Sequence, residues 1–380
     1  MAAFAAPANT AYLPSSDDQV LARVPARNTD PRARELLALR LAWRQQPTDV
    51  NAAVQLASRY FDEVAAEGDP RYVGYAQATL QPWWAQAEPP AAVRVLRAQV
   101  LQFDHQFALA LADLDGALRV QPDLGRAWAW RTAILMVQAD YKEARRSCER
   151  MAPYSTALIA AGCLAQVDAV TGRAAAAASA LRNALARHAD ATAAERLWCL
   201  TRLAETEERL GNAAAAEAAF KAALALAVPD VYLQAAYADF LLDQGRAADV
   251  LALLKGRGRA DVLLLRQALA AKATSDAQAP ALAQELAARF AAARQRGDTS
   301  HQKEESRFVL ALQGNAQQAL VLAQQNFAVQ REPADARILL QAALAARNAA
   351  AAGPALAWLA ASGVESQVLQ ALATQLKALP

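Results

Sequence analysis

Cysteine and histidine are the residues of this chain that could carry redox or metal chemistry, and their spacing limits both. The three cysteines are Cys148, Cys163 and Cys199, so at most one disulfide can form within the chain. The three histidines are His105, His188 and His301. They lie far apart, and none has the spacing to a cysteine or carboxylate that a metal site requires.

No catalytic motif accompanies these residues. The sequence contains no glycine-rich phosphate-binding loop, no nucleophile elbow and no closely spaced cysteine pair of the redox type. Nothing in it supplies an activated nucleophile with an orienting base. We therefore expect no catalytic residues, no metal site and no cofactor, and a protein that is not an enzyme.

A pattern that recurs every 34 residues predicts the elements that position these side chains. The first copy consists of Ala98, Phe107, Ala110, Leu114, Ala117 and Pro122. The second copy consists of Thr132, Tyr141, Ala144, Cys148, Met151 and Pro153. Further copies start near Leu158, Leu197 and Val231, with Gly172, Gly211 and Gly245 at their turns. A period of this length is typical of stacked helix pairs that bury their apolar faces only against neighbouring pairs.

This pattern resembles the tetratricopeptide repeat (TPR) family. The resemblance is carried by small residues where helices cross, by a proline that closes the second helix and by the segment 140–144. It is strong over residues 91–254 and weaker elsewhere. It implies an all-α fold, a right-handed α-solenoid of antiparallel helix pairs with about eight or nine pairs. The competing interpretation is an alanine-rich helical bundle, which would not keep these landmarks in phase.

We expect four regions along the chain. Residues 1–16 form an extended or disordered N-terminal arm, 17–90 irregular helical pairs, 91–257 regular repeats, and 258–380 degenerate repeats with a C-terminal capping helix. The apolar stripe in Val364–Leu379 could either cap the stack or drive end-to-end association. We expect capping, because terminal repeats need closure.

The repeat register also bears on the cysteines. It places Cys148 on the second helix of one repeat and Cys163 on the first helix of the next, and these helices pack side by side. A disulfide between them would close a loop of about 15 residues and stabilise the fold by about 3 kcal/mol. The alternative is two small buried thiols, because free cysteine is commonly interior. The sequence leaves both open, and Cys199 is expected in the core.

The first helices of such a stack line its concave wall, and the register assigns the residues that face the groove. The candidates are Gln99, Phe103, Arg126, Trp130, Gln166, Arg202, Glu205 and Asp239, and the register adds Gln102, Ala133, Trp198, Glu208, Arg209, Tyr232 and Asp243. Aromatic and arginine side chains dominate protein interfaces, so we predict a groove for an extended or helical peptide. One of Trp128 and Trp130 must instead be core. The TPR clamp for a C-terminal carboxylate is missing, because Val95 and Ala129 stand where its lysine and asparagine are expected.

Composition bounds the partner and the compartment. Lys and Arg number 39 against 37 Asp and Glu, a balance that argues against nucleic acid as the main partner. No charge-free apolar run is long enough for a membrane span. The N-terminus lacks the basic start of a secretory signal, yet it resembles the mature start of an exported bacterial protein. We expect a periplasmic or secreted protein whose signal peptide has been trimmed, with the cytoplasm as the alternative.

Together these features favour a non-catalytic scaffold or adaptor. It would bind a partner protein or peptide through the concave groove or the N-terminal arm, in a bacterial envelope assembly. The alternative is a structural component that self-associates or coats a filament or surface. The sequence specifies neither the partner nor the oligomeric state.

Overall fold

The computed structural model describes residue 16, residues 30–298 and residues 301–379. The expected N-terminal arm lies outside this part of the chain apart from Ser16, and so do residues 17–29. Every regular element in the described ranges is helical, which confirms the all-α fold. The helices are α1 Pro31–Gln45, α2 Val50–Glu67, α3 Arg71–Thr79, α4 Gln81–Trp84, α5 Ala91–Phe103, α6 Phe107–Val120, α7 Gly125–Val137, α8 Tyr141–Met151, α9 Ala157–Asp168, α10 Ala174–Arg187, α11 Ala193–Arg209, α12 Ala213–Leu224, α13 Val231–Asp243, α14 Ala247–Leu253, α15 Asp261–Ala273, α16 Ala279–Gln295, α17 Gln302–Phe308, α18 Ala316–Val329, α19 Pro333–Ala345, α20 Gly353–Ser362 and α21 Gln367–Lys377.

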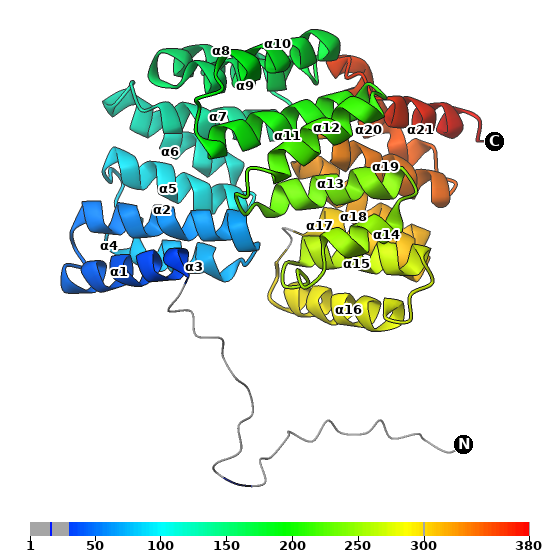
Figure 1. Cartoon of the computed structure of the whole chain (residues 1–380), viewed down its shortest axis with the longest axis horizontal. Coiled ribbons are helices and arrows are strands. Elements are labelled where there is room, and N and C mark those ends of the chain that lie inside the picture. Colours follow the sequence, from blue (N-terminus) through cyan, green and yellow to red (C-terminus); the bar gives the residue numbers. More distant parts are fainter. Residues whose placement is uncertain (1–15, 17–29, 299–300, 380) are drawn as a thin grey trace.

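Successive helices pack as neighbouring pairs, as expected for a TPR-like solenoid. The pairs run from α2–α3 through α5–α6 and α7–α8 to α17–α18, α1 packs against α2, and α19 packs mainly against α18 and α21. Figure 1 shows the pairs stacked side by side along the chain. The degenerate region keeps the same arrangement, because its helices still pair although their landmark spacing drifts.

Local sequence explains where the helices begin and end. The Asp30 carboxylate accepts a hydrogen bond from the backbone N–H of Arg32 at 3.0 Å, and Pro31 opens α1. Before α11, Thr192 and Glu195 form a capping box that satisfies two N–H groups of the first turn. Between α11 and α12, Gly211 adopts φ 83°, a conformation that costs other residues energy.

The last helices return to the middle of the chain and close the solenoid on itself. The backbone N–H of Arg331, just before α19, donates to the carbonyl of Val137 at the end of α7, at 2.8 Å. The Trp358 Nε1–H of α20 donates to the Tyr141 hydroxyl of α8 at 2.9 Å. One apolar core therefore joins α7–α9 to α15–α21. The C-terminal repeats thus pack against the middle of the chain, a contact that the predicted open groove did not include.

The C-terminal helix α21 buries its apolar stripe within this assembly. Leu369 and Leu376 are 2% and 1% exposed, and Leu372 and Leu379 pack against the same core. Val368 alone of the stripe remains exposed, at 40%. The helix caps the stack, and its apolar face is already covered by the chain itself.

Candidate functional site: a charged central cavity

The solenoid forms a cavity of about 720 Å³ that is partly open to solvent. Helices α2, α5 and α9 contribute residues near their C-terminal ends, and α11, α13, α15, α17 and α19 contribute longer stretches of one face. These are mainly the first helices of successive pairs. Stacking therefore brings side chains from distant repeats to a single hollow.

The cavity gathers five of the eight residues that the sequence assigned to a groove. Phe103, Gln166, Arg202, Glu205 and Asp239 all line it. Phe103 and Gln166 are half-buried, so part of each side chain remains available from the hollow. The register of the strong repeats thus identifies wall positions on α5, α9, α11 and α13.

Three of the eight residues do not line the cavity. Gln99 is 1% exposed, and its Oε1 accepts a hydrogen bond from Arg126 Nη2 at 3.3 Å, so it supports Arg126 and does not face a ligand. Arg126 also donates to the Ser58 hydroxyl at 3.0 Å, which ties α7 to α2. Trp130 is half-buried against the cluster that joins α5, α6 and α7. Gln99 is a correction to the expected groove, because the closed stack turns it toward a neighbouring helix.

Much of the opposite wall escaped the sequence analysis, because it belongs to the degenerate repeats. These residues are Arg266, Lys303, Glu304, Arg307, Glu332 and Arg337. The available signal was the alternation of acidic and basic residues on α15, α17 and α19. Without a strict repeat register, that alternation could not be distinguished from a solvated helix face.

In one set of cavity residues, the protein's own carboxylates neutralise the cations. Asp239 of α13 accepts from Arg266 Nη2 and from Arg307 Nη1, each at 2.6 Å. Burial alone would raise the pKa of Asp239, but these two guanidinium groups hold it well below its usual value. These ion pairs form a clamp that holds α13, α15 and α17 together.

The same clamp continues onto α19. Arg337 forms two hydrogen bonds with Asp243 of α13, at 2.5 and 2.7 Å, across 94 positions of sequence. Lys303 Nζ lies 3.7 Å from Asp335 Oδ1, a carboxylate with no exposed surface. These ion pairs fix the second half of the solenoid against the first.

Arg202 of α11, which also lines the cavity, has a carboxylate partner but an incomplete set of hydrogen bonds. Its Nη1 lies 3.1 Å from Glu205 Oε2, and its guanidinium lies 4.6 Å from the centre of the Tyr232 ring. The Tyr232 hydroxyl donates to Glu205 Oε1 at 2.5 Å. Tyr232 keeps 52% of its surface accessible, and it lines the cavity. The buried Nε of Arg202 has no hydrogen-bond partner among the described residues.

Arg209, two turns further along α11, has still fewer partners. Its one hydrogen bond within the described structure is from Nη2 to the Thr206 hydroxyl, at 3.3 Å, and its buried Nε has none. No described carboxylate lies within ion-pair distance of it. Burial lowers the pKa of Arg209, Glu205 partly offsets this, and the charge of Arg202 lowers it further. A buried guanidinium without a counter-ion is costly.

Glu208 lies beside these arginines but does not neutralise them fully. Burial raises its pKa to about 8, and the nearby carboxylates of Asp243 and Glu205 add to the shift, so the protonated form dominates at neutral pH. Burial likewise raises the pKa of Glu332. Eight Arg and Lys residues line the cavity against seven Asp and Glu. The formal charges of the lining residues therefore nearly balance, with one basic residue in excess.

Comparison with known proteins bears on the fold. No protein-family model matches the sequence, and no curated protein matches it. Among solved structures, the chain is similar to the APC/C hetero-tetramer Cut9–Hcn1, with 12% identity and a TM-score of 0.51, covering 87% of this chain and 63% of that chain. The chain has the TPR fold.

Two further structures are similar to this TPR solenoid. One is PilW, a widely conserved type IV pilus biogenesis factor, with 20% identity and a TM-score of 0.42 over 53% of this chain and 93% of that chain. The other is the human IFIT1 dimer with m7Gppp-AAAA, with 13% identity and a TM-score of 0.48 over 91% of this chain and 86% of that chain. At such identities, the likeness concerns the fold alone.

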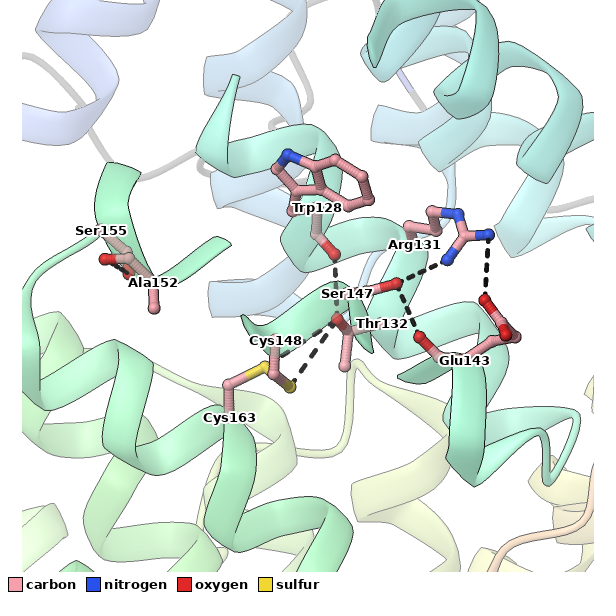
Figure 2. The surroundings of a disulfide bond; sticks show 9 residues. All are labelled: Trp128, Arg131, Thr132, Glu143, Ser147, Cys148, Ala152, Ser155 and Cys163. Atoms are coloured by element: carbon pink, nitrogen blue, oxygen red, sulfur yellow. Dashed lines mark hydrogen bonds and ion pairs between the residues drawn. A yellow bond between two sulfur atoms is a disulfide. The ribbon is translucent and has the colours of Figure 1, made fainter. Parts of the chain in front are cut away.

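A disulfide crosses from one TPR unit to the next behind the cavity wall. Cys148 of α8 and Cys163 of α9 are joined, with their Cα atoms 5.6 Å apart (Figure 2). The Thr132 hydroxyl of α7 lies 3.9 and 3.8 Å from the two sulfurs and bonds to the carbonyl of Trp128. Cys199 is free and buried, and burial raises its thiol pKa to about 12.

Neither a metal site nor a membrane span adds to these features in the described ranges. No group of three or more His, Cys, Asp or Glu side chains there is arranged to hold a metal ion. His105 lines the cavity, and burial lowers its pKa, which favours the neutral imidazole. None of the helices described has the length and hydropathy needed to cross a bilayer.

Proposed function

We propose that this TPR solenoid is a non-catalytic scaffold that binds a short segment of a partner protein at its central cavity. Solenoids of helix pairs present concave surfaces built from many repeats, and such surfaces suit chain-like ligands. The observation that carries the proposal is the half-buried aromatic Phe103, which lies with Gln166 and the charged residues of α11 on one continuous wall. An accessible aromatic anchor among polar groups is the usual centre of a protein interface.

The proposal is tested with peptides selected from a displayed random library on the purified chain. Binding is then measured by fluorescence polarisation for the wild type and for Phe103→Ala. We expect Phe103→Ala to weaken binding about tenfold or more, the loss typical of an interface anchor. Leu109→Ala is the matched control, because Leu109 of α6 is 57% exposed and does not line the cavity.

Trp130→Ala distinguishes the closed cavity from the open groove that the repeat register suggested. Trp130 packs against a separate cluster, so its loss should leave peptide affinity nearly unchanged. Equal binding by wild type and Phe103→Ala would contradict the proposed site. Strong loss in Trp130→Ala alone would move the interface to the outer face of α7.

We further propose that the protein works in a bacterial periplasm, as part of an envelope assembly. The disulfide supports this, because such bonds persist mainly in oxidising compartments. Alkylation of the native protein in intact cells tests it. Cys148 and Cys163 should resist modification until a reductant is added, whereas a fully reduced pair would favour the cytoplasm.

A further inference from the structure

The cavity contains two arginines whose bonding is incomplete, and they occupy the same face of one helix. Arg202 and Arg209 are seven positions apart on α11, which places their backbones about 10 Å apart along the helix axis. Both line the cavity, and the buried Nε atoms of both have no hydrogen-bond partner among the described residues. Guanidinium side chains are long enough to converge on one ligand from this spacing.

The remainder of the cavity shows that this arrangement is not general. Arg266, Arg307 and Arg337 each contact a carboxylate at 2.6 Å or less. Arg209, by contrast, bonds only to the hydroxyl of Thr206, which itself donates to the carbonyl of Arg202. An arginine in a protein interior is ordinarily matched by an acid, because an unmatched charge is costly to desolvate. Arg209 has no direct counter-ion among the described residues, and Glu205 and Glu208 act on it only at longer range.

We propose that the cavity binds a small organic anion whose phosphate or carboxylate group is held between the Arg202 and Arg209 guanidinium groups. The planar fork of arginine bonds to either group in bidentate fashion. The accessible Tyr232 ring lies beside Arg202 and offers an apolar surface to the rest of the ligand. A volume of about 720 Å³ lies within the range of small-molecule sites. This ligand site does not depend on a protein partner.

The experiment uses the full chain with no partner present. Inorganic phosphate and succinate are titrated separately at constant ionic strength, with chloride as the balancing anion. Binding is followed by the thermal midpoint and by calorimetry. We expect at least one of the two to raise the midpoint along a saturating curve, because a ligand that binds only the folded state stabilises it. The phosphate and succinate arms show which group the site prefers.

Two variants decide the site. Arg209→Gln should weaken the preferred anion about tenfold or more, since it removes a charged hydrogen-bond donor. Arg307→Gln is the matched control: it also removes a cavity arginine, but Asp239 then keeps Arg266, and anion affinity should be retained. Arg209→Lys provides a second measurement if the glutamine variant folds poorly. It keeps the charge but loses the fork, and should bind with reduced affinity.

The ligand-free protein gives an independent readout. Arg209→Gln should melt at the same temperature as the wild type or higher, because it removes an unmatched buried charge. A lower midpoint would assign Arg209 a structural role and overturn the proposal. So would the absence of saturable binding of both probes, or equal binding by wild type and variant, which would indicate an adventitious ion only.

Discussion

The charged residues of the central cavity form two sets, a matched set held by Asp239 and Asp243 and an unmatched set on α11, which differ in whether each arginine has an acid partner. On the side of α15, α17 and α19, Asp239 and Asp243 neutralise three arginines contributed by other repeats. On α11, Arg202 shares one carboxylate with a tyrosine, and Arg209 has no carboxylate partner in the part of the chain that the structure describes. The ion pairs of the matched set hold distant repeats together. The unmatched set has hydrogen-bond donors that a ligand from outside the chain could use.

The largest expected effect on stability comes from removing the Asp239 carboxylate, which two arginines of the matched set share. Asp239→Asn leaves Arg307 without its carboxylate and Arg266 with Glu304 at 3.4 Å, and it should lower the free energy of unfolding by about 3 kcal/mol. Urea denaturation measures the change. Asp115→Asn removes an exposed partner of Arg131 and should cost much less. A similar loss of stability in both variants would contradict the structural role of the Asp239 ion pairs.

The disulfide gives the next largest effect and separates the wall from the ligand site. Reduction, or Cys148→Ser with Cys163→Ser, opens a 15-residue link and should cost about 3 kcal/mol or somewhat less. Urea denaturation with and without reductant measures it, and Cys199→Ser serves as a comparison without a disulfide. Phosphate or succinate affinity should stay within about twofold of the wild type, because neither cysteine lines the cavity. A parallel collapse of affinity would show that the two regions are not independent.

Glu208, which lies on α11 with the unmatched arginines, makes the stability of the folded protein depend on pH. Its pKa of about 8 lies above the ordinary carboxyl value, so the folded protein holds a proton that the unfolded chain releases. The stability that this contributes is fully present below pH 4.5 and is lost as pH rises to about 8. Burial is the main cause of the raised pKa; the carboxylates of Asp243, Glu205 and Asp239 raise it further, and Arg337 lowers it.

Glu208→Gln should therefore flatten the fall in stability across this window, by on the order of 2 kcal/mol after allowance for solvent screening. Thermal midpoints from pH 5 to about pH 8.5 measure the slope. The exposed Glu149→Gln should reproduce the wild-type slope. An unchanged slope in Glu208→Gln would show that Glu208 ionises normally in the folded protein.

The smallest effect concerns the Tyr232 hydroxyl. Tyr232→Phe removes a donor to Glu205 and should cost about 1 kcal/mol of stability. It also frees Glu205 to approach Arg209, so anion affinity should fall. Tyr237→Phe loses the same kind of bond, to Glu217 outside the cavity, and should leave anion affinity unchanged. Equal anion affinity in both variants would mean that Glu205 does not compete for Arg209.

The fold was predictable because close helix crossings require small residues at fixed intervals. Ala98, Ala110 and Ala144 are fully buried in the positions that the 34-residue period assigns. The site was predictable only in part. Phe103 and Arg202 follow from the register of regular repeats, whereas Gln99 has the right register but is covered by Arg126.

The closure of the solenoid could not be predicted from one sequence. It depends on contacts such as Trp358 with Tyr141, which lie 217 residues apart and carry no local signal. For the same reason, Arg266, Lys303 and Arg337 did not announce a shared cavity. Their helices could be identified, but the side of the molecule that those helices would cover could not.

Anomalous diffraction from crystals soaked in tungstate, a heavy analogue of phosphate, tests most directly the comparison between the matched and unmatched arginines of the cavity. We predict a peak between the Arg202 and Arg209 guanidinium groups, and none at the pairs formed by Asp239. A cavity without a peak would contradict the proposal that the α11 arginines bind a ligand. So would a peak at Arg266 and Arg307 alone.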